Sequence, residues 1–407
     1  MLNRRTFIRS GAALGCSAAA HPFLTTVTLA SAPTQNRLVV IVLRGGLDGT
    51  DMVQPYGDSR LARYRPNLAA GPDAGALDLD GFFALNASFA PLMPLWQAGE
   101  LAFAHAVSTP YRQRRSHFDG QDLLEAGTGP DVGGALARQG WLNRMLQVTP
   151  GLSAQTAFAV GRSRMRLLDG DLSVPSWSPA TRLSLSSRSQ ALLEEVYHED
   201  PLFREAATEA MALAEGLDMG APDGGYAGGV SALSEMAAAV RRDEAPDALA
   251  AFTAERLRED TRIAAFSING WDTHQNQGRG LRNAAKRLNA AILTLRDGLG
   301  PVWGQTTVLA VTEFGRTVVE NGSKGTDHGT GGVMVMAGGA LSGAKVHGDW
   351  PGLSEAALLD RRDLRPTRDV RAYAGWAMRG LYGLDRAALE DTIFPGMDLG
   401  DDPGLIA

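Results

Sequence analysis

Residues 38–49 read LVVIVLRGGLDG, and this stretch decides the fold. Its first six residues are an unbroken aliphatic run, mostly β-branched, which stops at a glycine-rich loop that carries Asp48. A strand without polar alternation is typical of a parallel sheet covered on both faces, because both rows of its side chains must be buried. The stretch therefore predicts a central parallel strand with a polar residue beyond its carboxyl end.

Similar apolar runs recur at residues 101–107, 261–268, 307–311 and 333–337, with helix-like segments between them. The segment 116–126 is one such helix, with Ser116 as its expected N-cap. The segment 281–299 is a longer amphipathic helix. Strands that alternate with helices predict an α/β fold with a mostly parallel central sheet and helices on both faces. We expect one domain over 33–407, with a helical insertion at about 190–258.

The N-terminus carries an export pattern. Arg4 and Arg5 are followed by a polar residue, Phe7 and Ile8, which is typical of a twin-arginine signal. A weakly apolar, alanine-rich stretch follows and ends at a small-x-small cleavage site. We therefore expect residues 1–32 to be a signal peptide read by the twin-arginine export machinery, and the mature protein to be periplasmic or extracellular. A disordered basic N-terminus is the alternative.

Composition excludes several kinds of function. A net charge of −6 and a pI near 5.7 argue against a nucleic-acid-binding surface. No segment after the signal is long and apolar enough for a permanent membrane span. The single cysteine, Cys16, lies within the expected signal, so the mature chain should contain no disulfide and no cysteine-ligated metal.

Six carboxylate and imidazole side chains lie near the ends of the predicted strands. They are Asp48, Asp272, His274, Glu313, Asp327 and His328. The carboxyl ends of parallel strands meet at one edge of an open α/β sheet, where ligands bind, so we expect these side chains to gather there. The segment 327–329 precedes its strand, so its loop must fold back over the same edge. The set suits one or two divalent ions, with zinc or manganese most natural and calcium possible.

Each of these residues also has a structural explanation. Asp48 could cap a turn, and Glu313 could form an ion pair with Arg316 at a strand end. The segments 272–274 and 327–329 could be ordinary polar turns. No single motif is specific, and the metal site is expected because several of them end at one edge.

Ser116 is the candidate nucleophile, because the free N–H groups and the dipole at the start of its helix favour an incoming anion. Arg115 precedes it and could clamp a phosphate or sulfate group. A metal ion would lower the pKa of the Ser116 hydroxyl. Two alternatives stay open: Ser116 acts only as an N-cap, or His117 is the working residue, as a ligand or an acid. His347 lies beside Lys345 and could also line the cleft.

Seven stretches carry a resemblance to a known family. They are LRGGLDG at 43–49, RSHFD at 115–119, GWLNR at 140–144, GWDTH at 270–274, TEFGRT at 312–317, DHG at 327–329 and DLRPT at 363–367. Their order resembles the alkaline phosphatase and sulfatase superfamily. More closely, the chain is similar to the twin-arginine-exported, sulfatase-like proteins of unknown function within it, over nearly its whole length.

That resemblance implies an alkaline phosphatase-like fold and a set of site residues. The implied metal ligands and nucleophile are Asp48, Asp272, His274, His328 and Ser116. The sequence departs from the superfamily in two ways: the Asp272-x-His274 spacing is tighter than usual, and Glu313 stands where an Asp-His pair is usual. These departures predict that a second metal site is weakened or absent, and they leave catalytic activity open.

The resulting hypothesis is an exported, metal-dependent hydrolase of phosphate or sulfate esters that acts on an anionic small molecule or glycan. Ser116 would attack in line, and Arg115 or Arg316 would steady the ester oxygens. The alternative is a non-catalytic binding protein for an anionic glycan or polymer that keeps the fold. A cell-surface structural protein is a third possibility.

Overall fold

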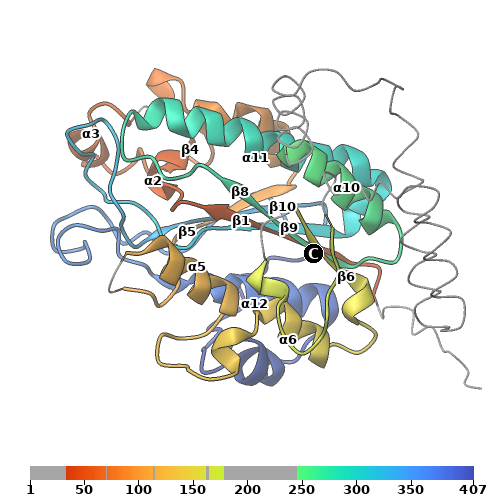
Figure 1. The fold of residues 1–407 in the computed structure, drawn as a ribbon. Coiled ribbons are helices and arrows are strands. Elements are labelled where there is room, and N and C mark those ends of the chain that lie inside the picture. The colour runs from red at the N-terminus through yellow and green to blue at the C-terminus, as the bar shows by residue number, and fades with distance from the viewer. Residues whose placement is uncertain (1–33, 70, 113–114, 162–164, 178–244) are drawn as a thin grey trace, which may run out of the picture.

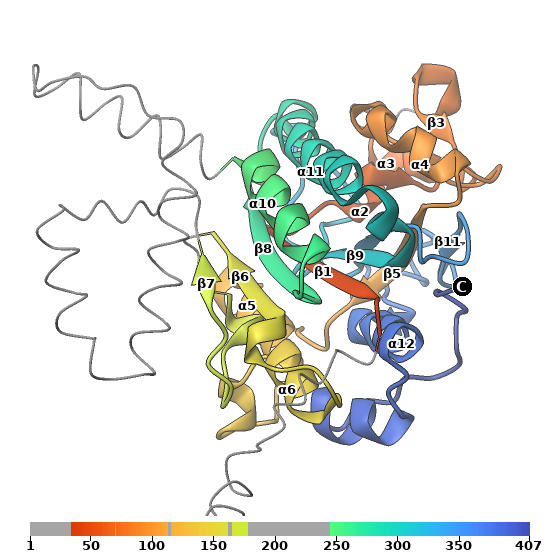
Figure 2. The same ribbon diagram turned by 90° about the vertical axis from the view of Figure 1, so that its right-hand side faces the viewer.

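The computed structural model describes residues 34–69, 71–112, 115–161, 165–177 and 245–407. A large sheet runs through this part of the chain, with helices packed on both of its faces (Figures 1 and 2). The expected α/β class with a mostly parallel sheet is therefore confirmed. No described helix combines the length and apolar character that a membrane crossing needs. The expected signal at 1–32, and most of the expected helical insertion, lie outside the described residues.

The strand order in the large sheet is β11-β5-β10-β9-β1-β8-β6-β7, and β12 pairs with β5. The bounds are β1 Arg37–Arg44, β5 Leu101–Ser108, β6 Ala157–Val160, β7 Ser176–Trp177, β8 Ile263–Asn269, β9 Thr306–Val311, β10 Gly332–Ala337, β11 Val346–His347 and β12 Arg368–Asp369. In this sheet the described pairings are parallel except those of β10, which runs antiparallel to β9 and β5. A small antiparallel sheet has the order β2-β4-β3; its strands are Val53–Gln54, Ala84–Leu85 and Leu77–Asp78.

Helices cover the sheet in two layers. The described α-helices are α2 Gly49–Met52, α3 Leu61–Tyr64, α4 Met93–Gln97, α5 His117–Ala126, α6 Trp141–Val148, α10 Pro246–Arg258, α11 Gln277–Leu299 and α12 Val370–Tyr382. Figure 1 shows α10 and α11 on one face of the sheet and α5, α6 and α12 on the other. Residues 38, 40 and 42 of β1 join the core that contains α6 and α12, whereas residues 39, 41 and 43 join the core that contains α10 and α11. This double burial is what the aliphatic run of β1 predicts.

The helices α5 and α6 follow β5 in the chain. Ser116 caps α5, and its Oγ accepts a hydrogen bond from the Asp119 N–H at 3.4 Å. The next α-helix in the chain, α6, begins at Trp141, after a stretch of turns and a short 3-10 helix at Leu136–Arg138. Of the expected insertion, the described part is α10, which packs beside α11.

The edge formed by the carboxyl ends of β1, β8 and β9 collects the loops of interest. Because β10 is antiparallel, its amino end lies at the same edge, so the loop between β9 and β10 leaves and returns there. Arg316 and His328 form an isolated antiparallel bridge across this loop. The loop therefore folds back as the sequence requires.

Candidate metal centre

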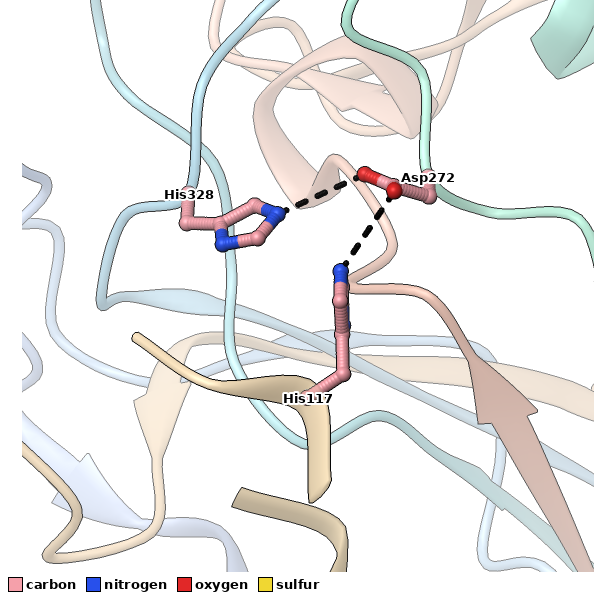
Figure 3. A group of neighbouring side chains, drawn as sticks. All are labelled: His117, Asp272 and His328. Atoms are coloured by element: carbon pink, nitrogen blue, oxygen red, sulfur yellow. Dashed lines mark ion pairs between the residues drawn. The ribbon is translucent and has the colours of Figure 1, made fainter. Parts of the chain in front are cut away.

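Three side chains from distant parts of the chain meet at this edge. His117 is the first residue of α5, Asp272 follows β8, and His328 precedes β10, and their ligand atoms lie within 4.8 Å of one another (Figure 3). The Nε2 atoms of His117 and His328 lie 3.5 and 3.4 Å from the two Asp272 carboxylate oxygens. This cluster of His117, Asp272 and His328 is a candidate site for a metal ion and is called the metal centre below.

His274 lies against the same centre. Its Nε2 is 3.0 Å from Asp272 Oδ1 and 2.9 Å from the Nε2 of His328. The tight Asp272-x-His274 spacing therefore still lets both side chains face one point. The centre is open to solvent, because Asp272 and His274 keep 45% and 40% of their side-chain surface exposed.

The far side of each imidazole is held by an acceptor. His117 Nδ1 lies 2.7 Å from Glu313 Oε1, His274 Nδ1 lies 3.1 Å from Asp327 Oδ1, and His328 Nδ1 lies 2.7 Å from the Arg115 carbonyl oxygen. A carbonyl oxygen only accepts, so Nδ1 of His328 carries its proton and donates it. Such contacts are typical of metal-binding histidines, because they fix the tautomer and leave Nε2 as the free lone pair.

The Nε2 atoms of the three histidines differ in their contacts within the described residues. His117 Nε2 is buried and accepts or donates no hydrogen bond there. The Nε2 atoms of His274 and His328 face each other at 2.9 Å, and two lone pairs at that distance repel unless a proton or a cation lies between them. Three imidazole nitrogens and one carboxylate are a donor set that fits zinc or a similar divalent ion.

The electrostatics of the centre follow from its hydrogen bonds. Burial acts to raise the pKa of Glu313, but hydrogen bonds from His117 and Gln121 lower it below its ordinary value. The same bond from Glu313 raises the pKa of His117. Burial lowers the pKa of His328, which favours its neutral, metal-binding form. Burial also acts to raise the pKa of Asp272, but it is lowered overall, first by its hydrogen bond with Arg316.

Arg316 positions Asp272 and does not face solvent. Its side chain is fully buried, and it donates to Asp272 Oδ1 at 2.6 Å and to four backbone carbonyl oxygens of residues 45, 46, 271 and 326. This placement differs from the expected contact with substrate oxygens, because the side chain is fully buried and bonded to Asp272 and to the backbone. Gly45 lets the backbone of Asp272 pack close to the loop after β1. Its φ is +121°, and a Cβ there would lie 2.5 Å from the Asp272 nitrogen.

Glu313 and Asp327 lie behind the imidazoles. Glu313 is fully buried, and its carboxylate accepts from the His117 ring, from Gln121 at 3.0 Å and from the Gly45 N–H at 2.9 Å. Asp327 holds His274, and its side chain is 53% exposed. Both residues were expected as ligands, and the structure gives them contacts with the rings that would hold the metal.

Asp48 has another partner. Its carboxylate forms a buried ion pair with Arg65 at 2.8 Å and accepts from Gln277 Nε2 at 2.7 Å. Gln277 also donates to the buried Asp51. Burial, together with the charge of Asp48, raises the pKa of Asp51 to about 6. The expected ligand role of Asp48 is thus replaced here by an ion pair, so we leave Asp48 out of the metal centre.

Ser116 directly precedes His117 of the metal centre in the sequence, and its hydroxyl faces its own helix. Among the described residues, Ser116 Oγ contacts the Asp119 N–H. Arg115 is 37% exposed, its Nη2 lies 3.2 Å from Asp363, and its Nε has no hydrogen-bond partner there. The Ser116 hydroxyl therefore caps α5, and Arg115 pairs with Asp363 beside the start of that helix.

Sequence reasoning missed Arg65, Gln277 and Gln121. Arg65 lies in a loop after α3, and Gln277 and Gln121 lie on helices, so none follows a predicted strand. An arginine or glutamine is common on a protein surface, and only its burial marks it as part of a site. Arg65 and Gln277 are fully buried.

We expect Glu313→Gln to weaken metal binding by about 10- to 100-fold, the usual cost of losing a group that supports a metal ligand. The amide oxygen can still accept from His117, but the negative charge that strengthens this ring as a ligand is lost. Competition with a chelator of known affinity measures the change. Glu255→Gln, in an exposed position of α10, is the matched control. Unchanged affinity in Glu313→Gln would show that Glu313 does not support the metal.

A family model described as "Protein of unknown function (DUF1501)" matches residues 101–371. No curated protein matches the chain. The family description names no activity, so the function has to be argued from the centre itself.

The chain is similar to several solved structures. The lipoteichoic acid synthase LtaP from Listeria monocytogenes is 9% identical, with 92% of this chain and 78% of that chain covered and a TM-score of 0.40. The lipooligosaccharide phosphoethanolamine transferase A from Neisseria meningitidis is 11% identical, with coverages of 93% and 62% and a TM-score of 0.37. A magnesium-bound mutant of the alkaline phosphatase from the Antarctic bacterium TAB5 is 10% identical, with coverages of 77% and 94% and a TM-score of 0.32.

Proposed function

The chain belongs to the DUF1501 family of proteins of unknown function, and we propose that it is a metal-dependent hydrolase of phosphate or sulfate esters. The observation that carries this proposal is the convergence of imidazole Nε2 atoms on the Asp272 carboxylate at a solvent-open sheet edge. The start of α5, where backbone N–H groups attract anions, lies at the same place.

We propose that one divalent ion is held by His117, Asp272 and His328, with His274 as the fourth ligand. Zinc suits this set best and manganese next, whereas calcium prefers a shell of oxygen atoms. The ion would polarise the ester oxygen and lower the pKa of the attacking hydroxyl. A second ion is not part of the proposal, because Arg65 already neutralises Asp48.

The chain's own residues would bind and orient the ester. The N–H groups of His117 and Phe118 have no acceptor within α5, as at every helix start, and so can bind ester oxygens. Arg115, with its partly exposed guanidinium, would steady the same oxygens. Ser116 would attack in line from the cap of α5, lose its proton to solvent and displace the alcohol of the ester, and water would then release the phosphate or sulfate from Ser116. Arg316 would hold Asp272 in place. The substrate class that fits is an anionic small molecule or glycan.

The test is to purify the exported form, measure its bound metal by elemental analysis and assay aryl phosphates and aryl sulfates. We expect close to one equivalent of metal per chain. Ser116→Ala should lower turnover by at least about 100-fold, because removing a catalytic nucleophile leaves little beyond binding and electrostatic effects. Ser59→Ala, at an exposed position, is the matched control.

Each failure has a separate meaning. A metal-free purified protein would contradict the metal-dependent mechanism. Turnover that survives Ser116→Ala would remove Ser116 as the nucleophile. Bound metal without turnover of any ester would support the alternative of a binding protein for an anionic glycan or polymer.

We also propose export through the twin-arginine pathway into the periplasm or beyond, on the pattern at Arg4 and Arg5. A centre assembled from distant segments exists only in the folded chain, and this pathway carries folded proteins. Changing Arg4 and Arg5 to Lys should retain the protein in the cytoplasm with its metal already bound. Cell fractionation followed by elemental analysis measures this, and a retained but metal-free protein would contradict loading before export.

A further inference from the structure

A second polar cavity lies away from the metal centre, between β11, β12 and the start of α12. Its volume is about 240 Å³, and the lining residues used here are Lys345, His347, Asp349, Arg368 and Tyr373. Figure 2 shows β11, α12 and the C-terminus on the same side of the molecule. None of these residues belongs to the metal centre, so this cavity is a separate feature.

Two cationic side chains line the cavity, Lys345 and Arg368. Within the described part of the chain, neither Lys345 nor Arg368 lies within ion-pair distance of an acidic side chain. Arg368 instead donates to the backbone carbonyl oxygens of Leu399 and Asp401 and lies 5.1 Å over the ring of Tyr373. The cavity therefore keeps a net positive charge even with Asp349 on its wall.

Two neutral donors also line the cavity, His347 and Tyr373. His347 is 6% exposed, and its ring makes no hydrogen bond with another described residue. Burial, with the charges of Lys345 and Arg368, lowers the pKa of His347 to about 4, so its ring is neutral and offers one N–H group. Tyr373 is almost fully buried, and burial raises its pKa, so it keeps its hydroxyl proton.

We propose that this cavity binds a tetrahedral oxyanion, phosphate or sulfate, either free or as a group on a larger molecule. Lysine and arginine together bind such groups through charge-assisted hydrogen bonds, and the neutral N–H and O–H donors add further contacts. The cavity has room for more than the ion itself. This site does not depend on the proposed hydrolase activity, because none of its residues touches the metal centre.

The test uses the full chain with His328→Ala, so that the metal centre cannot contribute to anion binding; chelator-treated wild-type protein is the second preparation. Calorimetric titration with inorganic phosphate, and separately with sulfate, should show one site per chain. Lys345→Gln should weaken that site at least tenfold, because it removes one of the two cations. Lys345 is the better position to change, because Arg368 also holds the C-terminal segment. Lys286→Gln, on the exposed side of α11, is the matched control.

Two further measurements locate the site and identify its ligand. Imidazole resonances followed by NMR should show the largest phosphate-induced shift at His347. Titration with glycerol phosphate separates a free ion from a group on a larger molecule: the tighter of the two ligands is the source, and either result supports the proposal. Binding that is unchanged by Lys345→Gln, a largest shift at another histidine, or no binding of any of the anions would overturn it.

Discussion

His328→Ala is expected to remove the bound metal and all measurable ester hydrolysis. The substitution deletes one of the converging Nε2 atoms, and with it the ring that faces both Asp272 and His274. Loss of a residue that only supports a ligand weakens metal binding by at most ~100-fold, and loss of a ligand should weaken it by more than that. Elemental analysis and chelator competition measure the loss, and turnover of an aryl phosphate follows it.

The fold should survive this change. The His328 side chain donates one hydrogen bond, to the Arg115 carbonyl oxygen, and losing it costs about 1 kcal/mol of unfolding free energy. His347→Ala, outside the metal centre, should keep full metal content and serves as the control. If the His328→Ala protein still binds metal with wild-type affinity, His328 is not a ligand and the proposed centre is wrong.

Arg65→Met is expected to destabilise the protein by about 3–5 kcal/mol, the usual result of leaving a buried charge without its partner. Arg65 and Asp48 are almost fully buried and 2.8 Å apart. Arg65 also donates to the carbonyl oxygens of Thr317 and Val318, at 2.7 and 2.9 Å, so these groups lose their donor as well. Chemical denaturation of wild-type and variant proteins measures the difference.

Two companion variants sharpen this result. The double variant Asp48→Asn with Arg65→Met should recover part of the loss, because it removes both members of the pair. Arg63→Met, on the exposed side of α3, should change stability by no more than about 0.5 kcal/mol. A loss below about 1 kcal/mol in Arg65→Met would show that the ion pair contributes little, and would reopen Asp48 as a metal ligand.

The gathering of carboxylate and imidazole side chains at one edge of the sheet was predictable from local sequence patterns. The aliphatic run before Asp48 and the runs before Asp272 and Glu313 each end where a strand ends, so their direction in a parallel sheet brings those residues together. The strand β10 was expected, but its antiparallel direction was not. It explains how His328 reaches the edge from the amino end of its strand.

The roles within the set were less predictable. Asp48 was expected beside the metal because it follows the end of the first strand. Nothing near it in the sequence shows which side chain it pairs with. Its partner, Arg65, comes from a loop after α3, and the pair becomes visible only when both are buried together. The sequence reading of Glu313 as a ligand likewise could not show that its carboxylate contacts the ring of His117.

By itself, the sequence determined the α/β class, the buried strand at 38–43, the cap at Ser116 and the presence of metal-binding residue types near strand ends. These follow from hydrophobic period and helix-start chemistry, which act between residues close in the chain. Only the tertiary structure decided which nitrogen of each imidazole faces Asp272, and that Asp48 is neutralised by Arg65. Those choices depend on side chains from distant segments competing for the same hydrogen bonds and charges, and the packing of the whole chain settles that competition.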